Sequence, residues 1–225
     1  MGYPGRVQTV VRQQHLKRAA TGLDLWDCRG AAFLYGESAA FSLALAWQVH
    51  LLEAGHPVFS VDGANRFDVF TLVDECLRRG LAVDPVLDAL CVQRAFTPYQ
   101  ILDAATRIYK EGDPRTLYFF LAPCKQFFDG DVNEEEGEYL LGRLLGVFAK
   151  IKQAGLNFVI ADRHYTAPAF RGALQGMYEL ADQHFAITKD DTYGQNPPTL
   201  FHADRRDRGA PAQLPPVAAQ RRSGA

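Results

Sequence analysis

The stretch FLYGESAAFSLALAWQ, Phe33 to Gln48, decides the fold of this chain. Its apolar start, which closes on Gly36, predicts a buried strand that ends in a tight turn. The apolar residues after this turn predict a helix over 38–53, for which Gly55 and Pro57 are stop signals. A strand, a turn and a long helix in this order indicate the first unit of an α/β protein.

The same alternation of strand and helix continues along the chain. Further strands are expected at 58–62, 91–95, 117–121 and 157–162. The helices between them are expected at 68–79, 84–90, 97–112 and 134–154, with Asp68 as a cap and Thr97-Pro98 as a second helix start. Nearly unbroken apolar strands separated by helices predict an α/β, doubly wound, mostly parallel central sheet with helices on both faces.

The two ends of the chain differ from this core. Residues 1–29 form a basic N-terminal lead-in with a helix-like centre from 7 to 20. After Arg163 the pattern loosens into a predicted loop, followed by strands at 185–188 and 200–202 that would extend the sheet edge as a hairpin. Residues 204–225 are Pro- and Arg-rich and predict a disordered tail. The expected division is therefore a lead-in, a core domain at 30–203 and a tail.

Composition limits the classes of function. The chain has 225 residues and a formal net charge of -2, so it offers nucleic acid or an anionic membrane no global attraction. The most apolar helical stretch, 39–52, is too short to span a bilayer. The cysteines, Cys28, Cys76, Cys91 and Cys124, have neither disulfide-framework nor zinc-site spacing. We expect a cytoplasmic protein without a bound cofactor or metal and without membrane contact.

The turn after Gly36 has the outline of a phosphate loop, G-x-x-x-x-G-K-[ST], without its chemistry. With Gly36 at the first position, Phe41 replaces the second Gly, Ser42 replaces the Lys and Leu43 replaces the magnesium-binding hydroxyl. The backbone cradle, the cation and the metal ligand are all lost. Gly36, Ser38 and Ser42 are the remaining candidates for a degenerate nucleotide site, and an ordinary strand-to-helix turn is the favoured interpretation.

Three later segments complete a colinear set with this turn: VFSVDGANRF at 58–67, VQRAFTPYQIL at 92–102 and LYFFLAPCKQFF at 117–128. Together they resemble the core of the RecA/RadA recombinase superfamily over residues 31–187. Asp62, Asn65 and Phe67 match the family's second-strand pattern. The resemblance implies a RecA-like P-loop ATPase core, and this chain is then a divergent paralogue.

The departures from the family pattern remove the ATPase. Ala64 stands at the position of the catalytic Glu, and Leu121 or Ala122 stands at the Walker B Asp. With the phosphate loop, three parts are missing together. Positioning and charge neutralisation supply nearly all of phosphoryl-transfer catalysis, so we expect no enzyme activity of this kind.

The family binds single-stranded DNA through two loops, whose counterparts here differ in charge. The first, FFDGDVNEEEGE at 127–138, is strongly acidic and predicts a favourable helix start rather than a DNA clamp. The second, over 163–183, mixes cations with aromatic residues that can stack on bases. The candidate DNA-binding residues are Arg163, His164, Tyr165, Phe170 and Arg171. A solvated loop packed by its own aromatics is the alternative.

Three functions fit the sequence. The first is a catalytically inactive RecA-like paralogue that acts as an accessory or mediator in DNA recombination or repair, with a recombinase or repair protein and single-stranded DNA as partners. The second is an interaction scaffold without a nucleic-acid role, favoured by the acidic segment. The third is an enzyme, because open α/β sheets bind ligands at the carboxyl ends of their strands. Its new site would consist of Asp62, Arg66, Asp68, Asp162, Arg163 and His164, with Asn65 as a further candidate in the first of these loops. A homo-oligomer is open in each case.

Overall fold

The computed structural model describes residues 8–12, 26, 28–36, 39–128, 132–163 and 169–188. These residues all belong to the first of two compact units, residues 1–191. The second unit, residues 192–225, lies outside the described residues, as does the strand predicted at 200–202.

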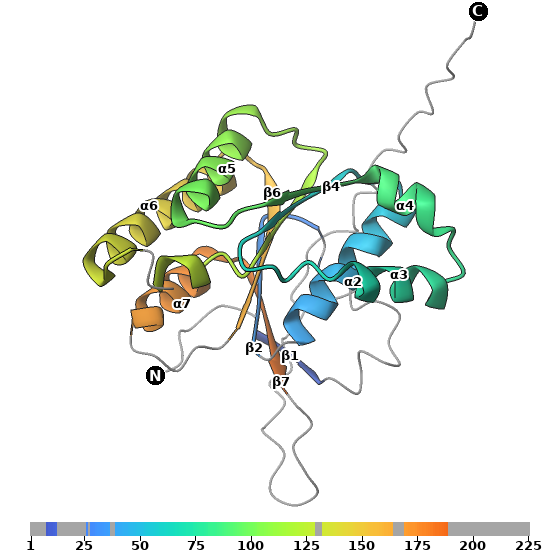
Figure 1. The fold of residues 1–225 in the computed structure, drawn as a ribbon, viewed down its shortest axis with the longest axis horizontal. Coiled ribbons are helices and arrows are strands. Elements are labelled where there is room, and N and C mark those ends of the chain that lie inside the picture. The colour runs from blue at the N-terminus through green and yellow to red at the C-terminus, as the bar shows by residue number, and fades with distance from the viewer. Residues whose placement is uncertain are drawn as a thin grey trace, which may run out of the picture. The chain divides into compact units, whose positions relative to one another are not determined.

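Within the described residues, the core is one sheet of seven parallel strands in the order β1-β7-β2-β6-β5-β3-β4 (Figure 1). The strands are β1 Gln8–Arg12, β2 Ala31–Gly36, β3 Val58–Asp62, β4 Leu90–Arg94, β5 Leu117–Leu121, β6 Asn157–Arg163 and β7 Gln183–Thr188. Every neighbouring pair is parallel, which confirms the predicted doubly wound α/β class. All carboxyl ends therefore meet at one edge, where ligands of open α/β sheets bind.

Helices cover both faces of the sheet (Figure 1). The helices are α2 Ala39–Glu53, α3 Val69–Arg78, α4 Val83–Ala89, α5 Pro98–Glu111, α6 Glu134–Gln153 and α7 Ala169–Leu180, and a 3₁₀ turn, η2, covers Lys125–Phe128. α2, α3 and α4 lie on one face and α5, α6 and α7 on the other. α2 is buried along most of its length because α3 and α4 pack on its outer side.

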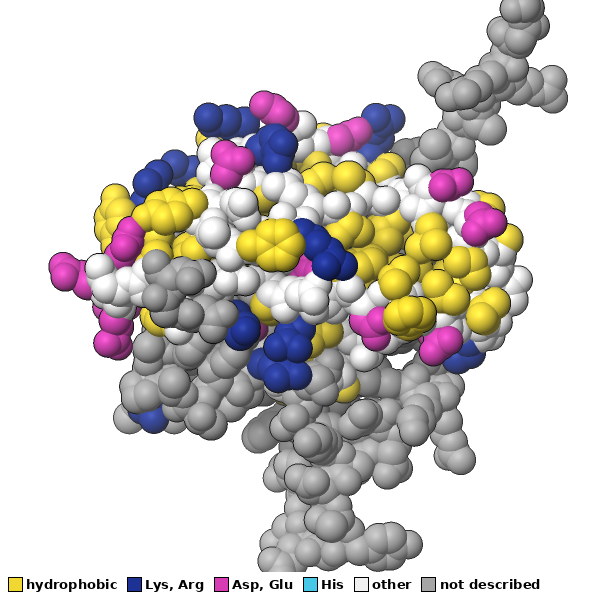
Figure 2. Space-filling view, in the orientation of Figure 1, with side chains coloured by type: hydrophobic (Ala, Val, Ile, Leu, Met, Phe, Trp, Pro, Cys, Tyr) yellow, Lys and Arg dark blue, Asp and Glu magenta, His cyan; other side chains and the backbone are white. Residues whose placement is uncertain are grey.

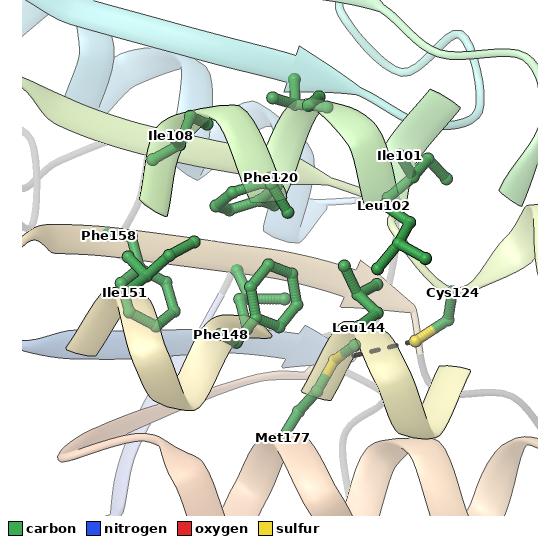
Figure 3. Close-up of a cluster of buried hydrophobic side chains, with 14 of the residues drawn as sticks. Ile101, Leu102, Ile108, Phe120, Cys124, Leu144, Phe148, Ile151, Phe158 and Met177 are labelled. Carbon is green, nitrogen blue, oxygen red and sulfur yellow. Dashed lines mark hydrogen bonds between the residues drawn. The ribbon is translucent and has the colours of Figure 1, made fainter. Parts of the chain in front are cut away.

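The face under α5, α6 and α7 holds a cluster of aromatic rings (Figure 3). Phe120 of β5 meets Phe148 of α6 edge-on, with centroids 4.7 Å apart, and Phe148 stacks on Phe158 of β6 at 5.7 Å. Beside them the Cys124 thiol lies 3.7 Å from the sulfur of Met177 on α7. Each fully buried ring contributes roughly 1.5–3 kcal/mol, so this cluster fixes the strands whose ends form the edge.

The helix starts follow local signals. The Asp68 side chain accepts a hydrogen bond from the Phe70 N–H and caps α3, and Thr97 caps α5 through the Gln100 N–H, as predicted. Asn133 caps α6 in the same way, and the acids of the α6 first turn stand where a helix N-terminus favours them.

Two segments differ from the prediction. Residues 8–12, expected within a helix, form β1 and pair in parallel with β7. β7 lies between β1 and β2, so the prediction that the strand at 185–188 extends the edge of the sheet is wrong. The second strand of the predicted hairpin, at 200–202, lies outside the described residues. A helix, α7, replaces most of the loop expected after Arg163. Gly176 lets α7 approach α6 closely, because a Cβ there would lie 2.5 Å from a terminal methyl group of Leu145.

No helix among the described residues is long and apolar enough to cross a membrane.

Candidate functional site

The turn at the end of β2 is shaped by the neighbouring strand. Gly36 has φ 133°, and a Cβ at this position would lie 2.1 Å from the carbonyl oxygen of Ile187 on β7. Phe41 and Leu43 are buried core residues and Ser42 is exposed, while Ser38 lies outside the described residues. Sheet packing therefore explains Gly36 without a phosphate ligand.

The residues that the resemblance matches to the family's two catalytic acids are apolar and pack in the core. Leu121 and Ala122 are fully buried at the end of β5, and the Ala122 N–H donates to the Ala161 carbonyl at 2.8 Å. Ala64 packs against the core on the α2 face. Among the described residues, no group of three or more His, Cys, Asp or Glu side chains is arranged to hold a metal ion.

Asp62, at the end of β3, organises the loop after this strand. Its side chain is only 1% exposed and accepts hydrogen bonds from the N–H groups of Arg66 at 2.7 Å, Phe67 at 3.1 Å and Ala64 at 3.4 Å. The Gln126 side chain also donates to the Gly63 carbonyl at 2.6 Å. Asp62 therefore fixes the shape of the 63–67 loop.

Asp68 is also used by the local structure. Its two carboxylate oxygens accept from the Phe70 N–H and, at 2.7 Å, from the Thr71 hydroxyl. These hydrogen bonds, the one from Thr71 foremost, lower the pKa of the carboxyl below its usual value. Of the four predicted site residues at 62–68, Asn65 and Arg66 are the two whose side chains neither hold the backbone of the loop nor cap α3.

Asn65 and Arg66 are held in defined positions. Asn65 has φ 54°, a left-handed conformation that asparagine tolerates, and its side-chain oxygen accepts from the Arg94 guanidinium at 2.5 Å. The Arg66 guanidinium lies 5.7 Å from the centroid of the Phe41 ring, within cation–π range. Its Nε is buried and has no hydrogen-bond partner. Phe41, which stands where a phosphate loop has its second glycine, thus positions a cation nearby.

Arg163 ends β6 in register with Gly36 of β2. Its Nε is buried without a partner, and its backbone N–H donates to the buried Asp162 carboxylate at 2.7 Å. The other oxygen of that carboxylate accepts from the Cys124 N–H at 3.2 Å. Among the described residues Arg66, Arg94 and Arg163 form no salt bridge, whereas Arg78, Arg79 and Arg115 do. Within the described part of the chain, three arginines without an acidic partner therefore lie at the carboxyl ends of the strands.

The other predicted DNA-binding residues are not all placed at this edge. His164 and Tyr165 lie outside the described residues, as does the side chain of Phe170. Arg171 is exposed on α7, so the prediction that it lies in a loop is wrong. The structure thus brings Arg163 to the candidate site and places Arg171 on a helix.

Two residues at the edge were not predicted as site residues. Arg94 ends β4, and Phe96 comes two positions later with 58% of its surface exposed. The RAF motif that contains both is a visible signal, but in the sequence it supports only the family resemblance. The contact between Arg66 and Phe41, which lie 25 positions apart, has no signal in the sequence.

Comparison with known proteins leaves the family open. The chain matches no family model and no curated protein. The RecA/RadA resemblance therefore stays a prediction, and the chemistry of the sheet edge is the firmer guide to function.

Proposed function

We propose that this chain is a non-hydrolysing RecA-like paralogue that acts as an accessory in DNA recombination or repair by binding single-stranded DNA. The proposal is carried by Arg163, a cation without a carboxylate partner among the described residues. β2 leads to α2 on one face and β6 leads to α7 on the other. Arg163 therefore lies at a topological switch point, where open α/β sheets bind ligands.

The absence of hydrolysis is supported by the residues at the positions of the family's catalytic groups. Phe41, Leu43 and Leu121 are each no more than 5% exposed and belong to the core. Introducing the second glycine of a phosphate loop, a metal-binding hydroxyl or a Walker B carboxylate at these three positions requires repacking of that core. Such a protein acts by binding, with a recombinase or repair protein as its second partner.

The cysteine thiols favour a location of this protein in the cytoplasm. Cys76, Cys91 and Cys124 form no disulfide, and two of the three are buried. Isolated thiols persist in reducing compartments.

A labelled oligothymidylate and fluorescence anisotropy at low salt test the proposal. Arg163→Ala is expected to weaken binding roughly threefold to tenfold and to reduce the slope of log K against log salt by about 0.7, the value for one phosphate contact. Arg115→Ala is the matched control, because this arginine is 81% exposed and lies before β5 at the opposite edge. Wild-type protein that does not bind, or an Arg163→Ala variant that binds equally well, refutes the proposal.

A protein-interaction scaffold is the second candidate, favoured by one surface. Phe70 and Leu77 are seven positions apart on α3, so they share a face, and they are 77% and 61% exposed. Figure 2 shows hydrophobic side chains gathered over α3 and α4. If Phe70→Ser abolishes binding of a purified recombinase while Arg163→Ala has no effect on it, this surface is the functional one.

The acidic residues of the enzyme hypothesis are already used to hold the local backbone. Asp62 accepts hydrogen bonds from the backbone of its own loop, and Asp68 caps α3. Asp162 accepts from the backbone N–H groups of Cys124 and Arg163. A carboxylate used in this way is a poor general base, because abstracting a proton disrupts the hydrogen bonds that hold its loop.

A further inference from the structure

We propose that Asn65, Arg66, Arg94 and Phe96 form a second contact region for single-stranded nucleic acid, on the β3–β4 side of the edge. This β3–β4 region takes the same class of ligand as Arg163, so the inference rests on the proposed function. Figure 2 shows basic side chains gathered around the middle of this face, next to exposed hydrophobic ones.

The Arg66 guanidinium is available to an anion. The cation–π contact with the Phe41 ring gives its N–H groups no hydrogen-bond acceptor, and among the described residues the guanidinium makes no hydrogen bond. The residue as a whole is half-buried, and of its guanidinium nitrogens only Nε is buried without a partner. The terminal nitrogens are therefore the donors that a phosphate oxygen can reach. Phe41 and the Asp62-bound backbone hold the arginine before any ligand arrives, which reduces the ordering cost of binding.

Arg94 is held in the same way by one partner. One of its terminal nitrogens donates to Asn65, which leaves its other N–H groups for a phosphate. The buried Asp62 carboxylate fixes the loop that presents Asn65, and the Asp62 carbonyl accepts from the Ala95 N–H at 2.9 Å. The loops after β3 and β4 are therefore tied to each other, and the two arginines belong to one rigid region.

Phe96 supplies an exposed ring two positions after Arg94, in the loop that follows β4. Its backbone N–H donates to the Gln100 side chain at 2.7 Å, and the Gln100 N–H donates back to the Thr97 cap. The loop is thus fixed, while the ring stays 58% exposed. An exposed aromatic ring in the same loop as an arginine is a combination in which bases stack while phosphates bind.

The sheet sets the spacing of the contacts. β6, β5, β3 and β4 are consecutive neighbours, so Arg163 and Arg94 are separated by three strand spacings, about 14 Å across the sheet. Arg163 also lies two residues beyond Ala161, the residue of β6 in register with Arg94. Lys125 begins the 3₁₀ turn after β5, between them in the strand order. A chain of phosphates laid across the strand ends meets positive charge at each end of this span. A short single strand fits this row better than an isolated phosphate group.

The test measures binding of the labelled oligothymidylate by the full chain and by single variants. Arg66→Ala and Arg94→Ala are each expected to reduce the salt slope by about 0.7. Phe96→Ala is expected to weaken binding at least about fivefold, the lower end for one stacked base. Arg115→Ala and Tyr109→Ala are the matched controls, because Tyr109 is an exposed aromatic residue near the other end of α5. Thermal melts verify that each variant is folded.

The outcomes separate this region from the proposed function. Wild-type protein that does not bind the oligonucleotide overturns both. Binding that depends on Arg163 but is unchanged by Arg66→Ala, Arg94→Ala and Phe96→Ala overturns the β3–β4 region alone. Competition by inorganic polyphosphate, with no effect of Phe96→Ala, shows a general polyanion site and also overturns the assignment to nucleic acid. Losses in all three variants, with both controls unchanged, support it.

Discussion

Replacement of Asp62 by alanine tests whether this acid is a structural element of the edge. The carboxylate accepts two short hydrogen bonds, at 2.7 and 3.1 Å, and a longer one at 3.4 Å from the backbone of its own loop. Hydrogen bonds to a charged group contribute about 1.5–3 kcal/mol each, and donors left buried without a partner cost about 1–3 kcal/mol. The contributions are not additive, and we expect Asp62→Ala to lower the free energy of unfolding by about 3–5 kcal/mol.

Asp62→Asn is the graded companion. An amide keeps one acceptor oxygen, so it can serve the N–H of Arg66 or that of Phe67 but not both on separate oxygens. We expect roughly half the loss of the alanine variant. For a chain of this size 1 kcal/mol corresponds to about 2–4 °C in Tm, so the two losses are well resolved by calorimetry or by a circular dichroism melt.

The same variants distinguish structure from catalysis. If Asp62→Ala melts at the wild-type temperature, the three hydrogen bonds carry no net stability and the explanation of this carboxylate is wrong. A folded Asp62→Asn variant that still binds the oligonucleotide with the wild-type salt slope shows that the negative charge itself takes no part in ligand binding.

Two further predictions concern the interior. Phe148→Ala removes a fully buried ring that contacts two others, and it is expected to lower the free energy of unfolding by about 3–5 kcal/mol. Tyr139→Ala, at an exposed position of the same helix, is expected to change the free energy of unfolding by no more than about 0.5 kcal/mol. Urea unfolding of both variants measures this difference. Cys91 is exposed and should react with a thiol reagent in the native protein. Cys124 is fully buried and burial raises the pKa of its thiol well above the usual value, so it should react only on unfolding, and equal rates for the two would contradict the packing.

Most of the core could be predicted from local patterns. The strand at 117–121 and the start of α6 at Glu134 agree residue for residue, because unbroken apolar runs and acidic first turns are local signals. β1 could not be predicted, since its five residues become a strand only by pairing with β7, which lies more than 170 positions away. α7 contains two glycines and two alanines among its twelve residues, which weakens its apolar period.

The location of the site could be predicted from the sequence, but the contacts of its side chains could not. The rule that ligands bind at the carboxyl ends of parallel strands led to Asp62, Asn65 and Arg66. No local pattern shows that Asp62 holds the loop whereas Asn65 and Arg66 do not. Their different roles depend on which side chains the backbone N–H groups meet in the folded loop. The cation–π contact of Arg66 depends in turn on α2, the helix after β2, and β2 is not a neighbour of β3 in the sheet.

The burial of Phe41 and Leu43 makes a phosphate loop hard to build at this turn. It requires Phe41→Gly and Leu43→Thr or Ser, at positions that are 5% and 3% exposed. Emptying two such sites costs about 2–5 kcal/mol each, which together approaches the whole net stability of a typical domain. Phe41→Gly also removes the ring on which the Arg66 guanidinium rests. Evolution toward an ATPase would therefore have to pass through a protein that is close to unfolding, unless stabilising substitutions elsewhere came first.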